Sequence, residues 1–71
     1  MAMTDYVGMK IKNNERTQVA ARANMNEIME WAEENAQGNC TFYIYKTVGQ
    51  SVTLCRKGIK CRSIQWEEVK P

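Results

Sequence analysis

The chain has no histidine, a single proline and only three cysteines among its 71 residues. Histidine is the commonest general base and the usual partner of serine and cysteine nucleophiles, so its absence argues against most acid–base and covalent catalysis. It also excludes Cys/His zinc sites, and Cys40, Cys55 and Cys61 lack the Cys-x-x-Cys spacing of a thiolate site. No glycine-rich phosphate loop is present. We therefore expect a protein that is not an enzyme and that holds no cofactor or metal.

Long hydrophobic runs are also missing. No segment approaches the ~20 apolar residues of a membrane span, and the first residues do not form a signal-peptide pattern. An odd number of cysteines fits reduced thiols in a cytosol. We expect one small domain over residues 1–71, located in the bacterial cytoplasm and not bound to a membrane. Met1 and Ala2 precede a second methionine, so residues 1–3 are expected to be a disordered cloning remnant.

The formal net charge of +2 is too small to indicate a nucleic-acid-binding protein by itself. The distribution of charge is more informative than its sum. No acidic residue lies between positions 46 and 62, whereas the segment from Asn24 to Gly38 holds four glutamates and no base. The basic residues of the first stretch are Lys46, Arg56, Lys57, Lys60 and Arg62. We expect the two signs of charge to lie on different parts of the molecule.

The segment Asn24–Gly38 has the pattern of an amphipathic helix. Asn24 can cap its start, Glu27 can complete a capping box, and Gly38 can end it in the left-handed conformation. At about 100° per residue, one arc gathers apolar side chains and the opposite arc gathers acids. The apolar arc holds Met25, Ile28, Met29, Ala32 and Ala36, with Trp31 on its border, and the acidic arc holds Glu27, Glu30, Glu33 and Glu34.

Before this helix, residues 6–12 alternate in polarity and predict a half-buried strand. Residues 13–16 have turn chemistry, and residues 17–23 can return as a second strand. A helix running unbroken over 17–37 is the alternative, because Ala20, Ala21 and Arg22 are good helix formers. We favour the hairpin, since the capping residue Asn24 would have no role inside a helix.

After the helix, residues 41–48, 50–57 and 60–67 read as three strands separated by turns at Gly49 and Gly58. A turn centred on Gly58 places Val52 opposite Ile64 and Leu54 opposite Arg62, with the apolar pairs under the helix and Cys55 beside Cys61 on the open face. At Val48-Gly49, a two-residue loop places Tyr43 and Tyr45 on the same face as Val52 and Leu54, and a loop one residue longer places Phe42 and Ile44 there instead. The expected fold is α+β, a single antiparallel sheet in the order β-β-α-β-β-β with one helix across one face.

Two surfaces are candidates for binding. Carboxylates in the last helical turn oppose the helix dipole, and Glu30 and Glu34 are a like-charged i,i+4 pair, so the acidic arc is a candidate contact for a basic protein groove. On the open sheet face we expect aromatic and basic side chains together, which suits either a protein interface or single-stranded nucleic acid. The residues expected there are Tyr6, Lys10, Lys12, Arg22, Lys57 and one aromatic pair of the third strand. Cys55, beside Lys57, is also a candidate reactive thiol.

The layout resembles one family of anti-CRISPR proteins, the small phage-encoded inhibitors of type I-F systems. The likeness rests on a first strand over 6–11, the turn with Glu15-Arg16, the strand opening at 17–19, the alanine-rich segment 20–23 and the turn at 47–49. The resemblance implies an accessory protein that sits on the backbone subunits of a CRISPR surveillance complex and blocks target DNA. Those proteins use lysines and arginines on and near the helix. This helix is acidic, so no binding residue is transferred.

These observations lead to two functional hypotheses. The first is a non-enzymatic phage or mobile-element protein that binds and inhibits a host protein complex, with Glu27, Glu30, Glu33, Glu34, Tyr43 and Tyr45 as contacts. The alternative is a small nucleic-acid-binding or regulatory module that uses Lys46, Arg56, Lys57, Lys60 and Arg62 to contact phosphates. Strand alternation predicts that Lys57 points away from Arg56, Lys60 and Arg62. A homodimer through an exposed edge strand is also expected to be accessible.

Overall fold

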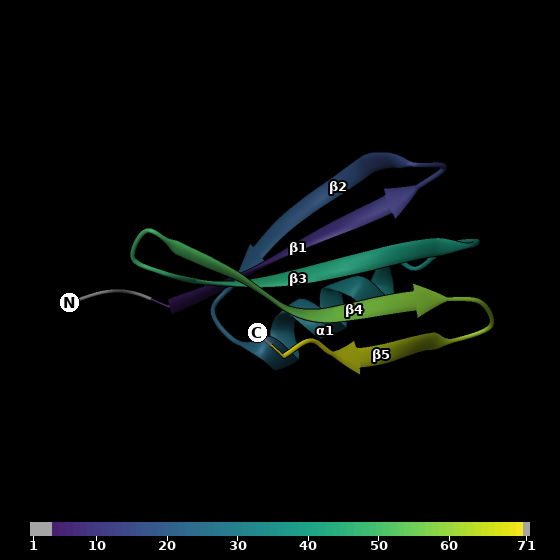
Figure 1. Ribbon diagram of the computed structural model, residues 1–71. Helices are drawn as coiled ribbons and strands as arrows, with labels where there is room; N and C mark the ends of the chain where they lie inside the picture. Colours follow the sequence, from purple (N-terminus) through teal and green to yellow (C-terminus); the bar gives the residue numbers. More distant parts are fainter. Residues whose placement is uncertain (1–3, 71) are drawn as a thin grey trace.

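The computed structural model describes residues 4–70 and has one five-stranded antiparallel sheet with a single helix (Figure 1). Along the chain the elements are β1 (Thr4–Lys12), β2 (Glu15–Arg22), α1 (Met25–Glu34), β3 (Cys40–Val48), β4 (Ser51–Lys60) and β5 (Ile64–Glu68). In the sheet the strands follow the order β2-β1-β3-β4-β5. The predicted fold class is confirmed, and the unbroken helix over 17–37 does not form. The expected disorder of residues 1–3 lies outside the described residues.

A tight turn at Asn13-Asn14 joins β1 to β2. Both asparagines have positive φ angles, 55° and 63°, and Lys12 lies opposite Glu15. This is the geometry of a two-residue type I′ loop, which asparagine tolerates better than most residues. Two residues further on, Thr17 is the extra residue of a β-bulge, and its hydroxyl donates to the Lys10 carbonyl at 3.3 Å.

The helix begins as predicted and ends earlier. The Asn24 side chain accepts a hydrogen bond from the Glu27 amide at 2.9 Å. Helix α1 stops at Glu34, not at Gly38, because Asn35 satisfies the last turn: its side-chain amide donates to the Trp31 carbonyl at 2.8 Å. Gly38 has the expected positive φ, 72°, but lies in the loop that leads to β3. The predicted apolar arc is confirmed, since Ile28 and Ala32 are fully buried.

Two tryptophans cover two glycines on the helix side of the sheet. Trp31 of α1 lies over Gly8, and Trp66 of β5 lies over Gly58. Phe42, which is fully buried, lies between the two indoles, with ring centroids 5.7 Å from Trp31 and 6.5 Å from Trp66. This aromatic row is the centre of the core, which also includes Ile28, Ala32, Cys40, Ile44 and Ile64.

The β3–β4 hairpin has the two-residue loop, with Val48 opposite Ser51 and Gly49 at a φ of 58°. Tyr45 therefore pairs with Leu54. Tyr43 pairs with Lys57, because a bulge at Cys55 shifts the register of β4. Tyr43 and Tyr45 lie on the same side of the sheet as Val52 and Leu54, as that loop length predicted. The bulge also reverses the alternation of β4, so Leu54 and Lys57 point to the same side of the sheet.

The predicted turn at Gly58 is wrong. Gly58 lies inside β4, and the connection to β5 is made by residues 61–63, so Lys60 pairs with Ile64 and Gly58 with Trp66. The glycine provides room for the Trp66 ring instead of reversing the chain. Cys55 and Cys61 are therefore not cross-strand neighbours. Val52 and Leu54 are not under the helix, because they pair with Thr47 and Tyr45, in the row of β3 that points away from it.

Within residues 4–70, no helix is long and apolar enough to cross a membrane.

Candidate protein-binding surfaces

One side of the sheet is covered by α1 and the other is open (Figure 1). Side chains alternate between the two sides, and Gly8, Phe42 and Ile44 point toward the helix. The residues between them therefore point to the open side, as the pairs Val7–Tyr45 and Met9–Tyr43 require. We define the open face by Val7, Met9, Ile11, Val19, Tyr43, Tyr45, Val52, Leu54, Lys57 and Ile59.

The open face is mainly apolar. Val52 is 64% exposed, Val19 55% and Ile59 40%, and the remaining apolar side chains are half-buried by their neighbours. A shallow hollow of about 310 Å³ lies at one end of the face, lined by Val7, Met9, Tyr45, Thr47 and Val52. Apolar residues that gather on an uncovered sheet face indicate an interaction surface, because soluble proteins seldom expose large contiguous apolar areas.

The described charges on the open side balance one another. Lys57 is half-buried, and its ammonium lies 5.9 Å from the centre of the Tyr43 ring, where the ring's π-electrons attract it. Glu67 is directly opposite Lys57 on β5. By the same alternation Asp5 and Arg16 also belong to this side, at different ends of the first hairpin. Two acids and two bases leave the face without net charge.

Several side chains expected on the open face lie on the helix side. Tyr6 and Arg22 pair with each other in the same row as Gly8, which faces the helix. Lys10 is in that row too, where it pairs with Phe42 and is only 8% exposed. Lys12 belongs to that row and approaches Gly38. Of the expected set, the two strand-three tyrosines and Lys57 are on the open face. The row with Gly8 must face the helix, because only it leaves space for the Trp31 ring.

Alternation alone did not place Val7, Met9, Ile11 and Ile59 on the open face. The glycines inside β1 and β4 could have indicated which row of side chains faces the helix. In β1, the row of side chains that includes Gly8 leaves space for a bulky side chain of the next layer. In β4, the row that includes Gly58 leaves the same kind of space. A glycine within a strand therefore marks the row that faces a large side chain of the next layer.

The acidic arc of α1 is a second surface, on the opposite side of the molecule from the open face. Glu27, Glu30, Glu33 and Glu34 are all exposed. Arg22 at the end of β2 joins three of them around a small cleft of about 200 Å³ that Trp31 also lines. Tyr43 and Tyr45 point the other way, so one flat partner cannot contact both the glutamates and the tyrosines.

The basic residues of the strand region divide between the two sides, as alternation predicted for Lys57. Lys46, Arg56 and Lys60 are in the row that faces the helix side, opposite Thr53, Ile44 and Cys40 respectively. Arg62 lies in the turn after β4. Lys60 is engaged locally, since its ammonium donates to the carbonyls of Cys61 at 3.4 Å and Arg62 at 3.0 Å. These five side chains do not form one continuous patch.

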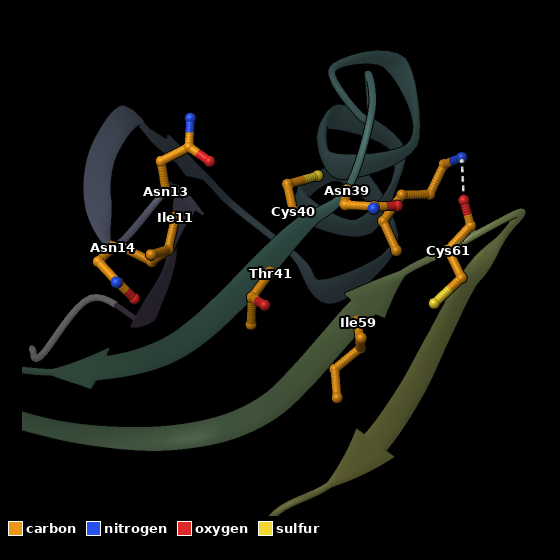
Figure 2. Close-up of a pocket in the computed structure, with 9 residues that line it drawn as sticks. Ile11, Asn13, Asn14, Asn39, Cys40, Thr41, Ile59 and Cys61 are labelled. Carbon is orange, nitrogen blue, oxygen red and sulfur yellow. Dashed lines mark hydrogen bonds between the residues drawn. The ribbon is translucent and has the colours of Figure 1, made fainter.

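A second hollow, about 390 Å³ in volume, lies at the turn end of the sheet (Figure 2). It is lined by Ile11, Asn13, Asn14, Asn39, Cys40, Thr41, Ile59, Lys60 and Cys61. Figure 2 shows Cys40 at the start of β3 and Cys61 in the turn after β4. Among residues 4–70, no group of three His, Cys, Asp or Glu side chains could hold a metal ion.

Comparison of the chain with protein-family models, with curated proteins and with solved structures gives no match.

Proposed function

We propose that this chain is a non-enzymatic protein that binds and inhibits a host protein complex, with the acidic arc of α1 as the contact surface. The observation that carries the proposal is the arrangement of Glu27, Glu30, Glu33 and Glu34, all exposed on the outer side of the only helix in the described chain. Glu30 and Glu34 repel each other, and the carboxylates of the last turn oppose the helix dipole. Such an arrangement costs stability, and a contact with a basic partner offsets that cost.

A basic groove that normally holds nucleic acid is the partner that this surface fits. Grooves of that kind present lysine and arginine side chains at spacings suited to phosphates, and exposed carboxylates carry the same sign of charge as phosphates. A protein occupying such a groove blocks nucleic acid from it. The resemblance to type I-F anti-CRISPR inhibitors makes a CRISPR surveillance complex, or another defence complex, the target that we propose. The acidic helix implies a contact different from the one used by those inhibitors.

The test is a tagged pull-down from bacterial lysate, performed with and without nuclease, followed by mass spectrometry of the retained proteins. We expect a stoichiometric partner that is retained after nuclease treatment. The double variant Glu30→Lys/Glu34→Lys should lose this partner. The helix should tolerate the change, since lysine and glutamate have similar helix propensities and Glu34→Lys places a base in the last turn, where the helix dipole favours it.

The matched control is Glu15→Lys/Glu68→Lys, which makes the same change in net charge at exposed strand positions outside the helix. This control should retain the partner. If the helix variant binds as well as the parent, the acidic arc is not the contact. Retention that is lost with nuclease would instead support the nucleic-acid hypothesis, and Lys46 and Arg56 would be the first residues to substitute.

A further inference from the structure

We propose that the open face is a self-association surface, on which a second copy of this chain packs sheet against sheet. The product is a four-layer dimer, with the two sheets inside and one helix on each outer side. This inference does not depend on the proposed function, which uses the opposite side of the molecule. In the dimer both acidic arcs remain exposed.

The size of the open face is adequate for a stable dimer. Five strands span the sheet, and β1, β3 and β4 each have 9 or 10 residues. Five strands about 4.8 Å apart and roughly 25 Å long give a flat area of roughly 600 Å². The side chains that project from the sheet make the accessible area larger than this. A standard interface buries about 800 Å² of accessible surface on each partner, so the open face is of the required order.

The composition of the face favours a second copy over nucleic acid. A strand of nucleic acid requires excess positive charge, whereas the described charges here cancel: Asp5 and Glu67 against Arg16 and Lys57. A face with no net charge does not repel its own copy. In a two-fold dimer each copy brings one Lys57 and one Glu67, so the base of one copy can meet the acid of the other.

The edges of the sheet are less suited to pairing than its face. The outer strand β5 has only 5 residues and carries Glu67 and Glu68, and the outer strand β2 carries Glu15, Arg16 and Arg22. Short, charged edge strands resist pairing with another chain. Three of the four exposed large apolar side chains, Val52, Val19 and Ile59, lie on the open face, and the fourth, Val48, belongs to the row on the helix side. Association through the face is therefore expected in place of edge-to-edge pairing.

Sedimentation equilibrium of the purified chain over a range of concentrations tests the proposal. We expect the weight-average mass to rise from the 8.2 kDa of one chain toward twice that value, 16.4 kDa. The double variant Val52→Asp/Ile59→Asp should weaken association by at least about 100-fold, because it places charges in an apolar contact. Both side chains are well exposed in one chain, so the variant should fold, which circular dichroism checks.

The matched control is Thr53→Asp/Ser51→Asp, which adds the same charge at exposed positions of the same strand that point to the helix side. This control should associate like the parent. A parent chain that stays monomeric at every concentration overturns the proposal. A dimer that persists in Val52→Asp/Ile59→Asp also overturns it, because the association then uses another surface. Neither result bears on whether the acidic arc binds a host complex.

Discussion

The indole of Trp31 lies against the backbone of Gly8. A methyl group at Gly8 would stand 3.1 Å from Cγ1 of Ile28, which is a tight contact. It would also stand 2.7 Å from Cζ3 of Trp31, which is closer than carbon atoms approach in folded proteins. This contact determines which side of β1 faces the helix. It turns Tyr6 and Lys10 toward α1 and leaves Val7, Met9 and Ile11 for the open face.

Gly8→Ala should therefore destabilise the fold. Alanine is favoured over glycine in a strand by about 0.5–1 kcal/mol, but overpacking in a close-packed core costs about 1–3 kcal/mol, so the clash prevails. Urea unfolding measures the loss of free energy of unfolding. Ser51→Ala, at an exposed strand position, is the control and should change stability by less than about 0.5 kcal/mol. A Gly8→Ala variant as stable as the parent would show that Trp31 does not rest on this glycine.

The second glycine allows the same idea to be tested with a double-mutant cycle. A methyl group at Gly58 would stand 2.8 Å from Cζ3 of Trp66 and 2.7 Å from Cγ2 of Ile64. Gly58→Ala should be destabilising alone and less so in a Trp66→Leu background, where part of the clash is gone. Ile64 remains, so the relief should be incomplete. Strict additivity of the two changes in unfolding free energy would contradict the contact.

The number and order of elements could be predicted because they depend on local signals. Asn24 caps the helix, paired asparagines turn the first hairpin, and Gly49 turns the second. Each signal acts within a few residues, and each was present in the sequence. The α+β class and the apolar arc of the helix followed from them.

The faces and the last register could not be predicted in this way, because they depend on contacts between distant residues. Alternation in β1 defines two rows of side chains but does not say which row is buried; Trp31, 23 positions after Gly8, decides it. In the sequence Gly58 has the pattern of a turn residue, and only its contact with Trp66 shows that it lies inside a strand. The bulge at Cys55 has no sequence signature, yet it places Lys57 and Ile59 on the open face.

The helix cap offers a third prediction. Asn24→Ala removes the oxygen that accepts the Glu27 amide at 2.9 Å and should cost about 1 kcal/mol of stability. Asn24→Asp keeps the acceptor and adds a negative charge near the positive end of the helix dipole, so it should be at least as stable as the parent. Asn26→Ala, on the exposed surface of the same helix, is the control. Equal unfolding free energies for Asn24→Ala and Asn26→Ala would exclude a capping role.

The three thiols should react in the order of their exposure. Cys61 is exposed and Cys55 is half-buried. Cys40 is only 6% exposed and belongs to the core on the helix side of the sheet. A thiol reagent should modify Cys61 first, Cys55 more slowly, and Cys40 only when the protein unfolds. Single Cys→Ser variants assign each kinetic phase. Modification of Cys40 at the rate of Cys61 would mean that the core opens readily under native conditions.

The turn at Asn13-Asn14 provides the last prediction. Asn14 has a φ of 63°, in the left-handed region that costs an ordinary L-residue about 1–2 kcal/mol and costs glycine nothing. Asn14→Gly gives the Asn-Gly pair that type I′ loops prefer and should match or exceed the parent in unfolding free energy. Asn14→Ala should lose about 1 kcal/mol, whereas Asn39→Ala, at an exposed loop position without positive φ, should be nearly neutral. Urea unfolding of the three variants decides the matter. If alanine and glycine at position 14 were equally stable, the first hairpin would not depend on a left-handed residue there, and the pairing of Lys12 with Glu15 would need another cause.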